Sequence, residues 1–272
     1  IWPIVERRVP ASRIPGEHLA ETQPFPTRPA PYDLQGLAED ELIDFTPELR
    51  QEALALLEDF DYGPFFQPPL HRDNDRAKRG AIWCPGDVGG TNINGTPAAD
   101  PETGILYVTS QKGCSSREIV PGHERDARIP QPTGTTISDF AVGQGFRTNV
   151  QGLPIFKPPY SRITAIDMNT GEHLWWIPVG DTPNRILEHP ALQGLDIGNT
   201  GSDQQAAQFV TPTLLFYTGN GSDGTPYLAV DKTSGERLGQ VELPASGRYG
   251  MMTYLHQGRQ HVVVQNQGGL VA

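Results

Sequence analysis

The chain has 272 residues, and its composition already excludes several classes of protein. Thirty glycines and 26 prolines occupy about one position in five, against roughly 12% in an average protein, which disfavours a bundle of long helices. No apolar run approaches the ~20 residues that a membrane-spanning helix needs. The 32 acidic and 21 basic residues give a net charge of −11. Because such a surface repels phosphate backbones, nucleic acid is not expected as a partner.

The first 80 residues predict an irregular opening followed by one helix. Residues 1–35 carry closely spaced prolines, which disfavour helix and interrupt backbone pairing, so this stretch is expected to dock over a surface rather than pair inside a sheet. Further on, Thr46 can cap a helix and Pro47 suits its first turn. The apolar positions that follow share one helical face: Leu49, Ala53, Leu56, Leu57 and Phe60.

From residue 81 onward, short apolar runs bounded by Gly, Pro, Asp or Asn predict β-strands. The strongest signal is a repeat: residues 165–172 (AIDMNTGE) and 229–236 (AVDKTSGE) align without a gap, and residues 98–104 form a weaker copy. In each copy the Asp can accept hydrogen bonds from turn amides, and the Gly supplies a left-handed position, so each predicts a hairpin. Recurring hairpins indicate a β-propeller, with a single β-sandwich as the alternative. Residues 117–148 and 181–203 are interpreted as loops between strands.

The cysteines and histidines give little support for a metal site. Cys84 and Cys114 lack metal-binding spacing; they could form one disulfide, which would suit an oxidising compartment, or remain separate thiols. Four further residues also lack the spacing of metal ligands: His123, His189, His256 and His261. The chain starts without Met and ends after an apolar strand pattern, which we interpret as part of a larger protein.

Residues 165–175 resemble the tryptophan-docking motif of quinoprotein dehydrogenases, with Asp167, Gly171 and Trp175 at the matching positions. In that family an eight-bladed β-propeller carries pyrroloquinoline quinone (PQQ) on its axis, and the Trp packs between neighbouring blades. The second copy has Gly239 where the Trp belongs. The proline-rich opening and three further segments are similar, in the same order, to membrane-type glucose dehydrogenases of this group: residues 85–108, 152–160 and 250–264.

The resemblance implies an all-β fold, a segment of a quinoprotein eight-bladed β-propeller with one inserted helix. All of residues 1–272 would belong to this partial propeller. Residues 1–80 would form the proline-rich wrap and the inserted helix, and residues 81–272 about three to four blades. The repeats would lie near residues 98–108, 162–177 and 227–243.

The resemblance also assigns one residue of the cofactor site. In the family, the Asn of a Gly-Gly-x-Asn-Trp segment reaches the edge of PQQ, and the matching residue here is Asn92, followed by Ile93 in place of the Trp. The family's catalytic Asp, Ca²⁺ ligands and basic residue at the quinone oxygens match no position of this chain, so no catalytic and no metal-binding residue is assigned. Three acidic residues are interpreted as solvated or turn carboxylates: Asp44, Asp59 and Asp87.

The function that the resemblance implies is oxidation of a sugar, polyol or alcohol in the periplasm, with electrons passed to a quinone. PQQ and Ca²⁺ would be the cofactors. The Ca²⁺ ligands and any attachment to the inner membrane would lie outside this chain, which would be the C-terminal part of the protein and inactive alone. A second class stays open: related propellers without a cofactor serve as protein-docking scaffolds, and Ile93 and Gly239 favour that alternative. A catalytic Asp and a metal-ligand pair in the upstream sequence would favour the enzyme.

Overall fold

The fold was analysed in a computed structural model. It describes residues 2–87, 89–91, 95–126, 138–219, 224–245, 247–266 and 268–272. Their backbone forms six β-sheets and only a few short helices, as the composition led us to expect. No helix among these residues has the length and apolar character that a bilayer crossing requires.

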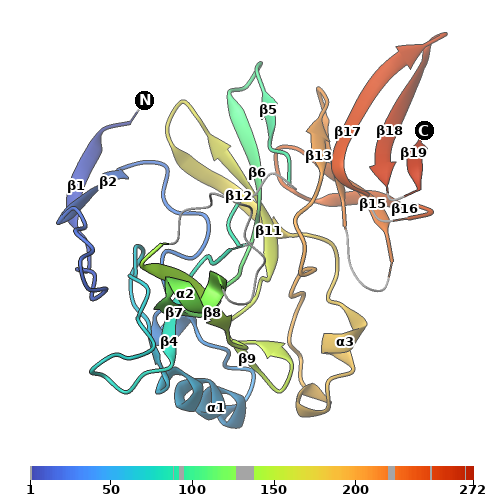
Figure 1. Ribbon diagram of the computed structural model, residues 1–272. Helices are drawn as coiled ribbons and strands as arrows, with labels where there is room; N and C mark the ends of the chain where they lie inside the picture. The colour runs from blue at the N-terminus through green and yellow to red at the C-terminus, as the bar shows by residue number, and fades with distance from the viewer. Residues whose placement is uncertain are drawn as a thin grey trace.

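Two four-stranded antiparallel sheets repeat the same architecture (Figure 1). The first sheet consists of β5 (Ala98–Asp100), β6 (Ile105–Gln111), β11 (Ser161–Asp167) and β12 (Glu172–Pro178). The second consists of β13 (Gln208–Val210), β14 (Leu214–Thr218), β15 (Pro226–Asp231) and β16 (Arg237–Glu242). In both, spatial order follows chain order, which is the arrangement of a propeller blade.

A third sheet continues the series. It contains β17 (Gly247–His256), β18 (Arg259–Asn266) and β19 (Gly269–Val271). Strand β13 lies against β5 on one side and against β17 on the other, so the first strands of the three sheets are neighbours and the sheets are arranged radially (Figure 1). The predicted β-propeller segment is therefore confirmed, and the single β-sandwich is excluded.

The two strong copies of the repeat occupy the same place in successive sheets. One forms the turn from β11 to β12 and the other the turn from β15 to β16. Asp167 Oδ1 accepts a hydrogen bond from Asn169 N at 2.8 Å, and Asp231 Oδ1 accepts one from Thr233 N at the same distance. The expected hairpins are present, and the Asp residues have the expected role.

The weaker copy does not mark a separate sheet, contrary to the expectation of a third repeat. It forms the turn from β5 to β6 and so belongs to the same sheet as residues 165–172. Asp100 Oδ1 accepts from Glu102 N at 3.1 Å, which is the same local bond that the strong copies make. The motif therefore indicates a tight turn, which can occur at more than one place in a blade.

An indole ring packs on a turn glycine at two successive sheet boundaries. Trp175 of β12 lies over Gly235 of the second sheet, where a Cβ atom would be 3.0 Å from Trp175 Cε3. Trp2 lies over Gly171 in the same way, with Trp2 Cε2 at 3.1 Å from the corresponding position. The docking role expected of Trp175 is thus observed. The matching contact of Trp2 was not anticipated.

The first two sheets enclose an apolar core and share a buried ion pair. Lys232 Nζ lies 2.6 Å from Asp100 Oδ2, and less than a tenth of either side chain is exposed. The hydroxyl of Tyr107 donates to the carbonyl of Lys232 at 3.1 Å. The core between the sheets includes Tyr107, Ile163, Ala165, Val179, Leu215, Tyr217, Leu228 and Val230.

The long connections gather at one end of the sheets, opposite the turns of the repeat. In an antiparallel meander, the chain enters the first strand, leaves the second, enters the third and leaves the fourth at the same end. The described parts of residues 84–97, 112–160 and 179–207 are therefore brought together. They form the lower half of the molecule in Figure 1, where they pack around a second core.

The predicted helix is confirmed in this lower half, but it ends at Leu57, so Phe60, which was expected on its apolar face, lies outside it. Helix α1 (Pro47–Leu57) begins after Thr46, whose hydroxyl accepts a hydrogen bond from Leu49 N at 3.2 Å. Leu49, Ala53 and Leu57 are buried in the second core. The 3₁₀ helix η1 (Glu39–Glu41) precedes α1.

A mixed sheet lies beside α1. Its strands, in spatial order, are β3 (Phe60–Asp61), β4 (Gly80–Trp83), β7 (Ser115–Pro121) and β8 (Phe140–Gly145). The interpretation of residues 117–148 as a loop was wrong for β7 and β8, which pair with each other. Buried and half-buried residues alternate along β7, because one of its faces packs inward. The shorter elements nearby are α2 (Gly122–Asp126), β9 (Asn149–Val150), β10 (Leu153–Pro154), α3 (Asn184–Leu187) and η2 (Pro190–Leu192).

A disulfide joins Cys84 and Cys114. Cys84 follows β4 and Cys114 precedes β7, so the bond connects the segment that leads into β5 with the segment that leaves β6. Of the two alternatives for the cysteines, the disulfide is confirmed. Cys84 is 2% exposed and belongs to the second core.

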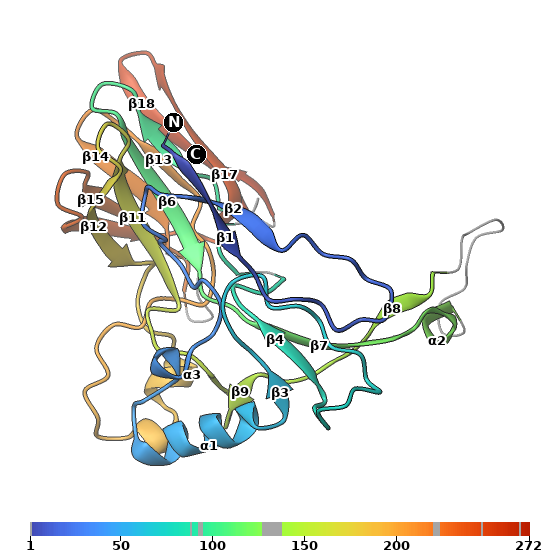
Figure 2. The ribbon, with the colours of Figure 1, turned by 90° about the vertical axis from the view of Figure 1, so that its left-hand side faces the viewer.

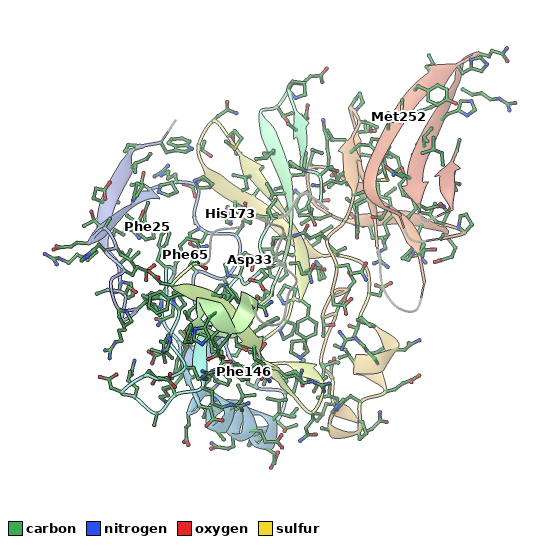
Figure 3. All side chains as sticks on the ribbon, in the orientation of Figure 1. Phe25, Asp33, Phe65, Phe146, His173 and Met252 are labelled. Carbon is green, nitrogen blue, oxygen red and sulfur yellow. A yellow bond between two sulfur atoms is a disulfide. The ribbon has the colours of Figure 1, made fainter. Side chains whose placement is uncertain are left out.

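The proline-rich opening forms a ribbon and then a strap, so the expectation that it would not pair in a sheet was wrong for two short strands. Strands β1 (Ile4–Arg8) and β2 (Thr22–Pro26) pair with each other in a separate, largely exposed two-stranded sheet. This sheet stands apart from the other sheets in Figure 1, and it faces the viewer in Figure 2. Residues 28–33 then cross the first blade sheet. His173 Nε2 of β12 lies 2.9 Å from the carbonyl oxygen of Ala30, and Figure 3 labels this histidine.

Candidate functional site

The glycine-rich stretch of residues 85–95, here called the Gly-Gly segment, leads from the disulfide to β5. Asn92, the residue expected at the cofactor, lies outside the described residues, as does Ile93. The site is therefore built from the residues on both sides, which are described: Gly89 to Thr91 before Asn92 and Gly95 after it.

Gly90 is held by two neighbouring sheets. It forms a two-way backbone bridge with Gln111 at the end of β6, with N–O distances of 2.7 and 3.0 Å. Its carbonyl oxygen also accepts a hydrogen bond of 2.7 Å from Nε2 of Gln205, which lies just before β13 of the second sheet. The carbonyl therefore has one donor from each sheet.

Two of the glycines are required because neighbouring atoms pack directly against their Cα atoms. A Cβ atom on Gly89 would lie 1.8 Å from the carbonyl oxygen of Pro85. A Cβ atom on Gly95 would lie 2.4 Å from Thr109 Cγ2 and 2.9 Å from Gln205 Cβ. No side chain fits at either position, which is why the sequence has glycine on both sides of Asn92.

Thr91 connects the Gly-Gly segment to the strap. Its hydroxyl donates to the carbonyl of Thr109 at 3.0 Å and lies 3.3 Å from the hydroxyl of Tyr32. Thr109 is fully buried, and its own hydroxyl accepts from Ala206 N at 3.1 Å. The residue that immediately precedes Asn92 is thus fixed to the inner part of the first sheet.

The start of the Gly-Gly segment is held by the strand that follows the disulfide. The backbone N–H of Asp87 donates to Ser115 Oγ at 2.8 Å, and the Asp87 carboxylate lies 2.9 Å from Nη2 of Arg117. Asp87 therefore forms an ion pair at the surface.

A charged cavity of about 830 Å³ lies between the strap, residues 62–64 and the first sheet. Lys112 Nζ donates to the carbonyl of Lys157 at 3.0 Å and lies 3.5 Å from Glu41 Oε2. Burial lowers the pKa of Lys112, while the Glu41 carboxylate opposes that shift. Arg162 Nε donates to the carbonyl of Tyr32 at 2.7 Å. Both cations attach the strap and its continuation to the first sheet.

Sequence reasoning did not identify Lys112, Arg162 or Gln205. Lys112 follows β6 and Arg162 lies near the start of β11, and charged residues are common at strand ends. Gln205 lies in a short polar stretch without a motif. Their partners are distant in sequence, so no local pattern points to them.

The described residues contain no group of three or more His, Cys, Asp or Glu side chains placed to hold a metal ion. The resemblance puts the ligands of a Ca²⁺ ion outside this chain, and none of these side chains is assigned to that ion.

Radial antiparallel sheets, the first two of which are joined by the indole ring of Trp175 on the turn glycine Gly235, define a β-propeller of the tryptophan-docked class. The chain belongs to the PQQ family described as glucose/ethanol/alcohol dehydrogenase, beta-propeller domain, which matches residues 1–262. This is the family that the resemblance indicated.

Two curated relatives illustrate the similarity. The quinate/shikimate dehydrogenase (quinone) of Acinetobacter baylyi is 24% identical over 97% of this chain and 33% of its own length. The quinoprotein glucose dehydrogenase of Escherichia coli is 26% identical over 98% of this chain and 34% of its own length. The chain thus spans about a third of the length of these relatives.

Among solved structures, the quinohemoprotein alcohol dehydrogenase from Comamonas testosteroni superposes with a TM-score of 0.43. The superposition covers 78% of this chain and 29% of that structure, at 16% sequence identity.

Proposed function

We propose that the protein carrying this chain is a PQQ-dependent dehydrogenase that oxidises a sugar, polyol or alcohol and passes the electrons to a quinone. The observation that carries the proposal is the family match over residues 1–262. The relatives include proteins named as quinate/shikimate, glucose and glycerol dehydrogenases, which is consistent with a hydroxylated substrate.

In this proposal the Gly-Gly segment provides one edge of the cofactor site. The side-chain amide of Asn92 would meet PQQ, since an amide N–H can donate to a quinone or carboxylate oxygen. PQQ, when bound, supplies the redox chemistry, and the protein supplies orientation and electrostatics. The close backbone packing at Gly89, Gly90 and Gly95 fits a segment that must hold one side chain in a fixed place. The catalytic base and the Ca²⁺ ligands would come from residues outside this chain.

The proposed location is the periplasm. Any attachment to the inner membrane would be through a segment outside this chain. The Cys84–Cys114 disulfide supports an oxidising compartment. Quinone would be the electron acceptor, and no nucleic-acid partner is proposed.

The alternative function, a protein-docking scaffold without a cofactor, has one supporting observation. At Gly239 of β16, where the docking Trp is missing, an added Cβ would meet no described atom within 4 Å, and every residue of β16 is exposed. This outer strand could receive a partner protein, but the same exposure is expected wherever a further blade would pack.

The test is reconstitution of the complete gene product with PQQ and Ca²⁺, followed by dye reduction with a panel of sugars, polyols and alcohols. We expect PQQ-dependent reduction that is at least tenfold slower in Asn92→Ala, because a positioned polar contact is removed. Asn149→Ala, an exposed asparagine of β9, is the matched control and should behave like the wild type. Absence of PQQ-dependent activity with every substrate would favour the scaffold.

A further inference from the structure

We propose that Gln205 is a positioning residue for the cofactor site, acting from the second sheet on the Gly-Gly segment. This inference rests on the proposed function, because it assigns a role to Gln205 through the contact of Asn92 with PQQ. Gln205 itself does not need to touch the cofactor or the substrate.

The first observation is the bond to Gly90. Gln205 is 5% exposed, and its Nε2 lies 2.7 Å from the Gly90 carbonyl oxygen. A hydrogen bond in such a buried place fixes the distance and the direction between its two groups. When the bond is lost, the Gly90 carbonyl loses that donor, and water cannot enter to replace it. Gly90 is separated from Asn92 only by Thr91.

The second observation is the contact with Gly95, on the other side of Asn92. Both Cβ and Oε1 of Gln205 lie 2.9 Å from the position that a Cβ atom would take on Gly95. One side chain therefore contacts the described residues at both ends of the stretch that contains Asn92. A rigid contact at both ends fixes the separation between them.

The third observation is that the backbone carrying Gln205 is itself fixed. Ala206 N donates to Thr109 Oγ1 at 3.1 Å, and Ala207 N donates to Thr218 Oγ1 at 3.0 Å. Both alanines are fully buried. The position of Gln205 is thus determined by β6 of the first sheet and β14 of the second, and a positioning group is effective when its own support is rigid.

The consequence is that the boundary between two sheets determines where Gly90 and Gly95 lie. Removal of the Gln205 amide would let Gly90 and Gly95 shift against each other. Mutation of residues that orient the ligands of a metal site typically changes affinity or activity by about 10- to 100-fold. We expect the loss in PQQ affinity to be in that range.

The chain contains a matched control for this role. Gln208 is 3% exposed, and its Nε2 donates to the carbonyl of Tyr107 at 2.7 Å. It thus makes the same kind of buried bond from the second sheet to β6, but its bonded partner is Tyr107 and not a residue of the Gly-Gly segment. A merely structural role would make the two glutamines equivalent.

The experiment compares Gln205→Met, Gln205→Glu, Gln208→Met and Gln208→Glu in the complete gene product. For each protein, the dissociation constant of PQQ in Ca²⁺ is measured by titration, and the midpoint of urea unfolding is measured without PQQ. Gln205→Glu keeps the shape of the side chain but replaces the N–H donor with an oxygen and adds a negative charge. Gln208→Glu is therefore its matched control, and this second pair keeps the test informative if Gln205→Met does not fold.

We expect both Gln205 variants to bind PQQ about 10- to 100-fold more weakly, with an altered absorption spectrum of the bound cofactor. The matching Gln208 variants should lower the unfolding midpoint to a similar degree and keep PQQ affinity within about twofold. Equal PQQ affinity in Gln205 and Gln208 variants would overturn the positioning role alone. A wild-type protein that does not bind PQQ would overturn the proposed function as well.

Discussion

Replacing Gly235 with alanine would test the docking of the first sheet on the second. Gly235 has φ of +76°, a region that residues with a Cβ atom rarely adopt. The added methyl group would lie 2.9 Å from Ile177 Cγ2 and 3.0 Å from Trp175 Cε3. Both distances are well below van der Waals contact, so the ring of Trp175 would have to move.

The expected loss of stability has two parts. The left-handed backbone costs a residue with Cβ about 1 kcal/mol. Forcing a methyl group into a packed contact costs about 1–3 kcal/mol more. Gly235→Ala should therefore lower the free energy of unfolding by about 2–4 kcal/mol.

Gly258→Ala is the matched control for this prediction. Gly258 lies in the turn between β17 and β18 with φ of +75°, and its added methyl group would meet no described atom within 4 Å. It should lose only the backbone part, about 1 kcal/mol. Urea unfolding of the complete gene product, followed by tryptophan fluorescence, measures both. Equal losses in the two variants would refute the conclusion that Trp175 docks on Gly235.

The buried pair of Asp100 and Lys232 gives two predictions. Lys232→Met should lower the free energy of unfolding by about 3 kcal/mol, because it leaves a buried carboxylate without its cation. A double variant that also carries Asp100→Leu should recover part of that loss. Additive losses would show that the two groups are not coupled. The hydrogen bond from Lys232 lowers the pKa of Asp100 to about 2, below its value of about 3.9 in the unfolded chain. The contribution of the pair to stability should therefore be complete above about pH 4 and be lost as pH falls from there through about 2. Urea unfolding across that range would show the free energy of unfolding falling with pH, and this slope should be weaker in Asp100→Asn. The disulfide gives the last prediction: Cys84→Ser with Cys114→Ser should lose about 3–4 kcal/mol, because the bond closes a loop with a sequence separation of 30. Dithiothreitol should destabilise the wild type similarly and leave that variant unchanged, and a wild type that is indifferent to the reductant would contradict this estimate.

The features that the sequence predicted are those set by local chemistry. Helix α1 follows from a cap at Thr46 and apolar spacing over its first three turns. The turns after β11 and β15 follow from Asp and Gly at fixed positions. The same locality explains the error at residues 98–104, since an identical turn bond can join any two consecutive strands. The docking of Trp175 was predictable because its motif has a fixed spacing from the turn.

The features that were missed depend on contacts between distant residues. Trp2 packs on Gly171, but it lies at the start of the chain without a repeat before it. Strand β7 begins with four polar residues (SSRE), which hid it as a strand, and its pairing with β8 depends on the mixed sheet around them. Gln205 becomes a candidate only when Gly90 and Gly95 are seen beside it. Neither composition nor periodicity carries that information.

Titration of PQQ into the complete gene product, in the presence of Ca²⁺, measures directly whether the protein has a PQQ site and whether Asn92 contributes to it. We expect saturable binding with one PQQ per chain, weakened at least tenfold in Asn92→Ala and unchanged in Asn149→Ala. Absence of saturable binding to the wild type would contradict the assignment of a PQQ site to this protein. Binding that is equally tight in Asn92→Ala would contradict the placement of Asn92 at the cofactor.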